Sequence, residues 1–163
     1  MVWIDRHWIY CKRRLLEEGM NISDNAHIKI DSLSINGEDW SYIDQITGKG
    51  LETIASKLGS NTADESWMPF IAIGDGLVTP SSEDLVLGSE TYRKRGIVTV
   101  VANTYFVEAS FAKDEPITDT WIREIGIFDA ISGGNMGARW LLVDEVLKEY
   151  DEEIYIKIAI SIT

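Results

Sequence analysis

Apolar and polar residues alternate with a period of two along much of the chain, which is the pattern of pleated strands. The plainest example is the last one, in which five isoleucines share a face: Ile154, Ile156, Ile158, Ile160 and Ile162. A second alternating stretch covers residues 121–128 and places Trp121, Arg123, Ile125 and Ile127 on one side and Ile122, Glu124, Gly126 and Phe128 on the other. Both sides carry large apolar groups, so we expect a strand that is covered on both faces.

This stretch contains a glycine and ends in a turn. Gly126 lies inside the strand, where glycine usually marks a bulge or a close backbone approach. Residues 132–135, Ser-Gly-Gly-Asn, supply glycines that can take positive φ angles. We therefore predict a central strand followed by a hairpin.

Further strands are predicted on both sides of this hairpin. Residues 27–36 alternate with a change of phase near Ser32 that predicts a bulge, and Asn36-Gly37 predicts a two-residue hairpin returning through Trp40 and Tyr42. Residues 70–73 form a short apolar run, and residues 97–112 predict one long strand. Residues 140–143 are strand-like, although the apolar spacing from 142 to 150 also suits a helix.

Helical spacing occurs once clearly, between Thr47 and Leu58. Apolar side chains follow one face, with Thr47 as N-cap and Gly59 as the stop. The run from Thr79 to Asp84, with a proline after a threonine cap, predicts a second short helical turn. The expected fold is mainly β with one or two short helices, a β-sandwich or jelly-roll-like domain with an N-terminal arm.

Charge divides the chain into two regions. Residues 1–16 carry four basic side chains against one acid, a net of +3, and the rest carries −15 because the whole chain of 163 residues carries −12. A region with this much negative charge would repel phosphate, and nucleic acid is therefore not an expected partner. No apolar run reaches the roughly 20 residues that cross a bilayer, and no secretory signal is expected.

The basic N-terminal segment is also aromatic, and it supports two interpretations. It either packs on its own domain or docks on another subunit through side chains that we propose as an interface: Trp3, Arg6, Trp8, Tyr10, Arg13, Arg14 and Trp40. We therefore divide the chain into an arm, residues 1–45, and a sandwich-like domain, residues 46–163.

Catalytic and metal-binding patterns are weak. Cys11 and His7 lie four residues apart inside the aromatic segment, where packing is the simpler interpretation. Asp75, with Glu83 and Asp84, offers oxygen ligands for calcium, but the spacing is not that of an EF-hand. We expect no catalytic residues, no cofactor and no metal.

Glu124 is the one carboxylate whose position needs an explanation. It lies in mid-strand between apolar neighbours, where a charge must be paired or hydrogen-bonded. Arg93, Arg95 and Arg139 are the candidate partners, and we predict a structural ion pair rather than a catalytic acid.

Two motifs in this order resemble a known group of proteins. The segment F-I-A-I-G-D-G-L-V-T-P-S-S-E-D-L-V-L-G-S-E precedes W-I-R-E-I-G-I-F-D-A-I-S-G-G-N-M-G-A-R. They resemble the "IGxG…P…SDxxLxxE" and "ITEIGLFD…GGxLLAR" segments of small structural proteins of tailed bacterial and archaeal viruses. The resemblance covers about residues 47–162, and Asp75 and Met136-Gly137 depart from it.

The resemblance implies a non-enzymatic structural subunit of a virus particle, in the tail, fibre or baseplate or as capsid decoration. The implied partners are other virion proteins and further copies of the chain, in a homotrimer or another symmetric oligomer. The implied location is the virion, after synthesis in the host cytoplasm. The alternative is a carbohydrate-binding module in which Trp67, Trp121 or Trp140 stacks on sugars.

Overall fold

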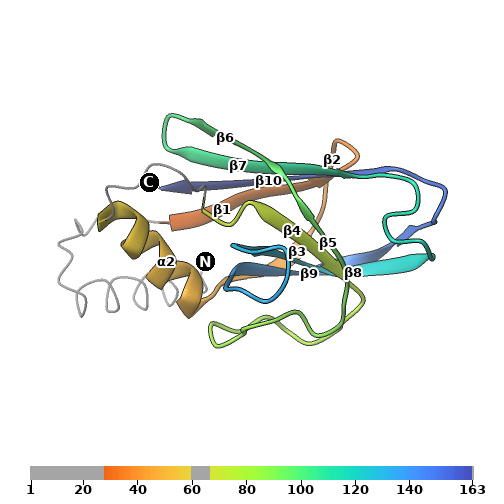
Figure 1. The fold of residues 1–163 in the computed structure, drawn as a ribbon, viewed down its shortest axis with the longest axis horizontal. Coiled ribbons are helices and arrows are strands. Elements are labelled where there is room, and N and C mark those ends of the chain that lie inside the picture. The colour runs from red at the N-terminus through yellow and green to blue at the C-terminus, as the bar shows by residue number, and fades with distance from the viewer. Residues whose placement is uncertain (1–27, 60–66, 163) are drawn as a thin grey trace.

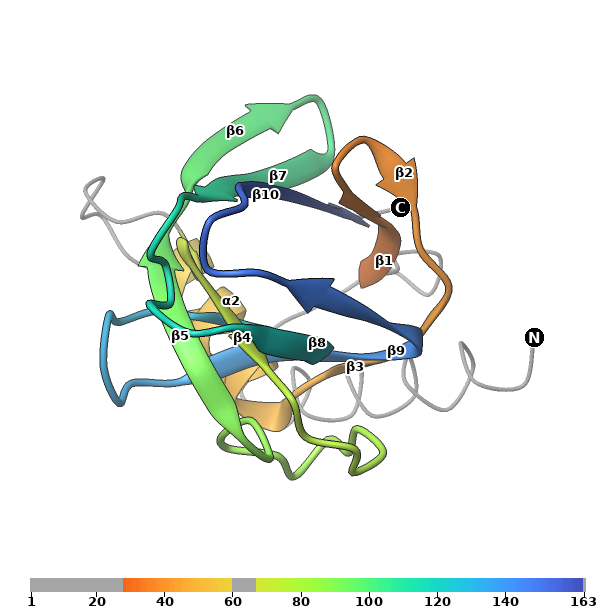
Figure 2. The ribbon, with the colours of Figure 1, turned by 90° about the vertical axis from the view of Figure 1, so that its right-hand side faces the viewer.

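In the part of the chain that the structure describes, two five-stranded antiparallel sheets pack face to face (Figures 1 and 2). The computed structural model describes residues 28–59 and 67–162. In spatial order, sheet A contains β2 (Glu38–Asp39), β1 (Ile28–Ile35), β10 (Ile154–Ile162), β7 (Thr104–Phe111) and β6 (Ile97–Val101). Sheet B contains β3 (Tyr42–Ile46), β9 (Met136–Lys148), β8 (Thr120–Phe128), β4 (Phe70–Gly74) and β5 (Glu90–Arg95). The predicted mainly β, sandwich-like fold is confirmed.

Sheet A is built around β10, which pairs with β1 on one side and β7 on the other. Isoleucines 154, 156, 158 and 160 are all buried between the sheets, as the alternation predicts. The predicted bulge in β1 is confirmed by a shift of register between Ile30 and Ser32. This shift brings Leu33 and Ile35 into the core.

Sheet B has a larger irregularity, which changes one sequence prediction. Ile122 pairs with Val146 but Glu124 pairs with Leu141, so β9 contains extra residues at this point. The phase of β8 changes with it, and Ile122 lies in the same core as Ile125 and Ile127. Placing Ile122 on the face of Glu124 was therefore wrong.

Two other predicted elements differ from the structure, and one alternative is excluded. The long strand of residues 97–112 is a hairpin of β6 and β7, with Ala102 at a φ of 52°. Residues 79–84 form a turn, Asp84 N–H donating to Ser81 C=O at 3.1 Å, and not a helix. Residues 140–148 belong to β9, so the helical alternative for this region is excluded.

The predicted domain boundary also needs correction. The Asn36-Gly37 hairpin exists, both residues having positive φ, but its return strand β2 has only two residues. The chain then crosses to sheet B, where β3 pairs with β9. Residues 28–45, assigned to the arm, are thus part of both sheets, and Trp40 packs on the core. Residues 1–27 lie outside the described residues.

The helix α2 (Gly48–Gly59) begins where predicted. The Thr47 hydroxyl accepts a hydrogen bond from the Gly50 N–H at 3.0 Å, and it donates one to Met136 C=O. A Cβ on Gly50 would lie 2.1 Å from the carbonyl oxygen of Gly137. The helix therefore contacts β9 backbone to backbone, and the glycine makes this approach possible.

Candidate functional site

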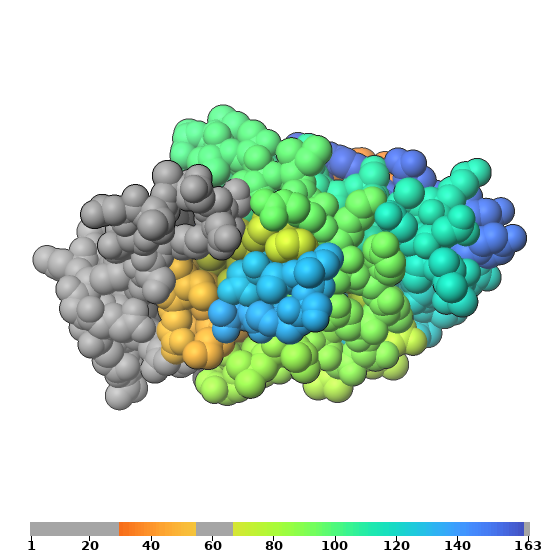
Figure 3. Space-filling view, viewed as in Figure 1, coloured from red at the N-terminus to blue at the C-terminus, as the bar shows by residue number. Residues whose placement is uncertain are grey.

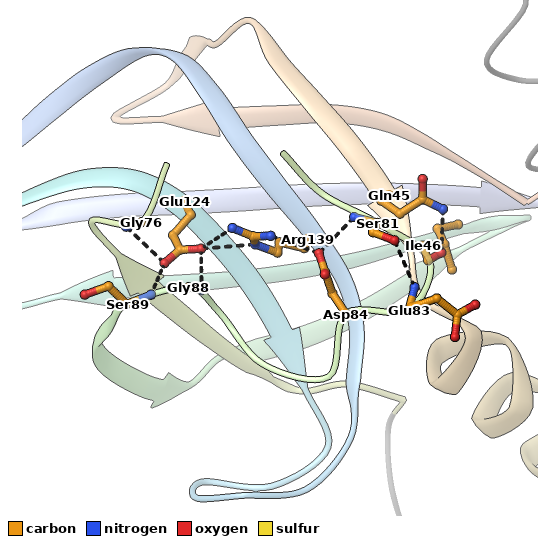
Figure 4. A network of polar contacts seen from close by, with 10 residues as sticks. All are labelled: Gln45, Ile46, Gly76, Ser81, Glu83, Asp84, Gly88, Ser89, Glu124 and Arg139. Atoms are coloured by element: carbon orange, nitrogen blue, oxygen red, sulfur yellow. Dashed lines mark hydrogen bonds and ion pairs between the residues drawn. The ribbon is translucent and has the colours of Figure 1, made fainter. Parts of the chain in front are cut away.

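A buried ion pair joins β8, the middle strand of sheet B, to its neighbour β9 (Figure 4). Glu124 on β8 has no exposed surface, and Arg139 on β9 is 1% exposed. The guanidinium donates through Nη2 at 2.7 Å and through Nε at 3.0 Å, both to Glu124 Oε2. Of the three arginines considered from the sequence, Arg139 is the one that holds Glu124.

The same carboxylate also binds the backbone of a long loop, residues 75–89. Oε1 accepts hydrogen bonds from the N–H of Ser89 at 2.6 Å and of Gly76 at 3.1 Å, and Oε2 accepts one from Gly88 at 2.9 Å. A Cβ on Gly76 would lie 2.4 Å from Oε1. Both ends of the loop are therefore fixed by one side chain, and we call this arrangement the Glu124 clamp.

The middle of the loop is fixed through Arg139. Its Nη1 donates to Asp84 Oδ2 at 2.9 Å, and the same oxygen accepts the Ser81 N–H at 2.8 Å. One guanidinium thus lies between two carboxylates, one fully buried and one partly exposed. This pairing supplies the compensation that a buried charge needs.

An apolar contact completes the attachment of the loop to sheet B. Leu87 packs with Phe128, Met136 and Ala72 in a small cluster separate from the main core. A Cβ on Gly126 would lie 2.9 Å from Leu87 Cδ2, which explains the glycine inside β8 by a close side-chain approach. β8 is therefore covered on both faces, as its sequence predicts.

Arg93 does not bind Glu124; it binds the β8–β9 hairpin, which lies beside the loop. Its Nη1 donates to the carbonyls of Ala130 and Gly133, both at 2.8 Å, and its guanidinium lies 3.5 Å from the centre of the Phe128 ring. It also pairs with Glu90 at 2.7 Å. Arg95 lies over the Phe70 ring instead. The predicted ion pair of Glu124 is thus made with Arg139, and the other two candidates, Arg93 and Arg95, have different partners.

The two motif segments therefore meet in space. The first motif supplies the loop and the second supplies the clamp, the glycine under Leu87 and the hairpin that Arg93 holds. The sequence predicted an ion pair for Glu124 but not its binding of the loop, because the three backbone N–H donors leave no signal in the side chains. The glycines at 74 and 76 were the one feature of the sequence that pointed to a close approach.

The clamped loop displays apolar side chains on its outer surface. Leu77 is 71% exposed, Leu85 60%, and Val78 and Val86 66% each. The loop lies along the lower edge of the molecule in Figure 3, near the β8–β9 hairpin. An apolar surface on a fixed loop is suited to binding another protein.

Other predicted site residues are distributed as follows. Within the described residues no group of three or more acidic, histidine or cysteine side chains could hold a metal ion, and Asp84 is used by Arg139. Trp140 is buried, Trp67 packs on the core and donates to Thr53, and Trp121 is 41% exposed. The row of exposed tryptophans that would favour glycan binding is not formed by these three. The interface residues proposed in the arm other than Trp40 lie outside the described residues, and so do Cys11 and His7.

Comparison of the chain with protein-family models, with curated proteins and with solved structures gives no match. No helix among the residues that the structure describes is long and apolar enough to cross a membrane.

Proposed function

We propose that this chain is a non-enzymatic structural subunit of a tailed-virus particle, acting through protein–protein contacts in the tail, fibre or baseplate or as capsid decoration. The observation that carries the proposal is that the two motifs behind the family resemblance form one structural unit. That unit is the Glu124 clamp, and its product is a fixed loop with an apolar surface.

The chemistry of the clamp supports a structural role. Both oxygens of Glu124 are occupied by N–H donors, and the side chain has no exposed surface. A carboxylate used in this way stabilises a conformation. It has no free oxygen with which to take up a proton from a substrate.

The surface of the loop supports assembly. The loop exposes four large apolar side chains, Leu77, Val78, Leu85 and Val86, and exposed apolar surface of this kind is typical of protein-interaction sites. A loop that is already fixed loses little conformational entropy on binding, so more of the contact energy appears as affinity. Repeated copies on a particle would bury this surface against a neighbour or against each other.

Two experiments test the proposal. Mass spectrometry of purified virus particles should detect the protein in constant proportion to the other particle proteins; its absence from particles would contradict the proposed function.

In the second experiment, Leu77→Asp together with Val86→Asp should abolish incorporation into particles while leaving the fold intact. Ile117→Asp is the matched control, because Ile117 is 77% exposed on a different loop. Equal incorporation of both variants would exclude the loop as the contact.

A further inference from the structure

The outer face of sheet B carries a second exposed apolar surface, which adjoins the clamp where Leu141 pairs with Glu124. Ile43 pairs with Leu141, and Trp121 pairs with Leu147 across the same sheet. Tyr42, Ile122 and Val146 pack on the core. Ile43, Trp121 and Leu147 are adjacent to them in sequence and therefore lie on the opposite face of the sheet. Val143 is 64% exposed, Ile43 43% and Trp121 41%. We call Ile43, Trp121, Leu141, Val143 and Leu147 the sheet B patch.

An acidic stretch of the chain adjoins this patch at Val143 and Leu147. Residues 143–153 contain six acids and one lysine, a net of −5, and one of these acids, Glu145, pairs with Arg123 beside Trp121. The lysine, Lys148, is buried and donates to Ala112 and Glu152 carbonyls, so it contributes little positive surface. Glu152 raises the pKa of the Glu149 carboxyl, as crowded like charges do. A partner that covers the patch should therefore be apolar and basic.

Such a segment occurs in this chain, before the first described strand. Residues 1–16 carry Arg6, Lys12, Arg13 and Arg14 against Asp5, together with two tryptophans and a tyrosine. We propose that residues 3–16 of a neighbouring copy dock on the sheet B patch, with the aromatic side chains on the apolar surface and the basic ones toward residues 143–153. This inference rests on the proposed function in assembly and names the contact between copies.

The position of Ile28 favours a neighbouring copy over the chain's own segment. Ile28 pairs with Ile162 at one end of sheet A. Lys148, beside Leu147 of the patch, reaches Ala112 and Glu152 at the opposite end. An intramolecular path would run the length of an eight-residue strand, roughly 26 Å, and then around a sandwich whose layers lie about 10 Å apart. Residues 17–27 span at most about 40 Å when fully extended. A neighbour imposes no such extension.

Charge reversal in the full-length chain tests the proposal. One variant reverses the segment, Arg13→Glu with Arg14→Glu, and another reverses the acidic side of the patch, Asp144→Lys with Glu149→Lys. We expect each variant alone to lose the self-association that sedimentation detects for the unchanged chain. An equimolar mixture should regain it, because opposite charges again face each other between copies. Added salt should weaken association of the unchanged chain.

The control is Glu38→Lys with Asp39→Lys, which makes the same charge change on the exposed strand β2 of sheet A. It should associate as the unchanged chain does, and thermal melting of every variant verifies folding. Undiminished association of the single variants, or no recovery in the mixture, would overturn the inference, as would a strictly monomeric unchanged chain. If the Leu77→Asp/Val86→Asp variant is excluded from particles but both charge-reversal variants are incorporated normally, the proposed function stands and this inference fails.

Discussion

The Glu124 carboxylate binds both Arg139 and the backbone of the loop. Oε2 accepts hydrogen bonds from Nε and Nη2 of Arg139, and the guanidinium neutralises the charge of the carboxylate. The two oxygens together also accept three backbone N–H groups from the loop. The ion pair and the loop are consequently one cooperative network, in which a change at either partner is felt at the loop.

Substitution of Glu124 by glutamine should strongly destabilise the fold. The change leaves Arg139 buried beside Asp84 alone and presents an amide N–H₂ to donors that need an acceptor. We expect a loss of about 3–5 kcal/mol in the free energy of unfolding, measured by urea titration. Glu145→Gln is the control, because its pair with Arg123 is partly exposed and should contribute no more than about 1 kcal/mol. Equal effects for both variants would contradict the clamp.

Replacing both partners by methionine separates the pair from the loop. The double variant Glu124→Met/Arg139→Met leaves no uncompensated charge between these two positions, but it also removes the acceptor of the Gly76, Gly88 and Ser89 amides. These amides should then exchange with solvent deuterium faster than in the unchanged protein. Unaltered exchange would mean that the loop is held by Leu87 alone.

Asp44 on β3 is a residue at which acid should favour folding. Burial raises the pKa of its carboxyl, partly offset by a hydrogen bond from its own backbone N–H. The folded state thus binds the proton more tightly than the unfolded state, and this contribution to stability is lost as pH rises through the folded pKa. Asp44→Asn should stabilise the protein near neutral pH, with the difference fading in acid. A difference in urea midpoint that stays constant with pH would contradict this assignment.

At the level of single residues, the sequence predicted that Glu124 needs a partner, but it did not predict which arginine that partner is. A mid-strand glutamate must be paired, so the requirement could be derived from sequence. The choice among three arginines depends on strand order, because Arg139 becomes adjacent only when β9 pairs with β8. Arg93 is on β5, separated from β8 by β4, and its guanidinium reaches the hairpin instead.

Among the elements, strands bounded by strong turn residues were predicted well. Asn36-Gly37 and Gly133-Gly134 have the positive φ angles that end a strand, and both hairpins form. Ala102 and Asn103 give a weak turn signal between two apolar runs, so β6 and β7 were read as one strand. The extra residues of β9 opposite β8 were missed because a bulge of this kind preserves the local alternation on each side.

The contact between α2 and β9 leads to an unusual expectation for a glycine in a helix. Gly→Ala within a helix normally stabilises by about 0.5–1 kcal/mol. Gly50→Ala should instead destabilise, because its methyl group would overlap the backbone of Gly137. Thermal melting would measure the change. Lys49→Ala is the control in the same turn, with an exposed side chain that pairs with Glu52 only at the surface. A rise in melting temperature for Gly50→Ala would show that the helix can move away.

For the whole molecule, truncation should separate the two candidate boundaries. A chain that begins at residue 28 retains every strand of both sheets and should melt cooperatively. A chain that begins at residue 46 lacks β1, β2 and nearly all of β3, leaving β10 and β9 with open edges, and should be insoluble or unfolded. Circular dichroism and solubility distinguish the outcomes. A folded product of the shorter chain would restore the boundary at residue 45.

The position of β10 at the centre of sheet A has a consequence for synthesis. β1 is made long before β10, yet its eight residues pair with that strand, Ile28 opposite Ile162. Until then β1 and β7 are both unpaired on the side that β10 will fill. Sheet A therefore forms only once β10 has been made, through contacts of high sequence separation that fold slowly. Any transcript cut short before β10 would yield a chain with two exposed strand edges, a substrate for proteases and chaperones rather than for assembly.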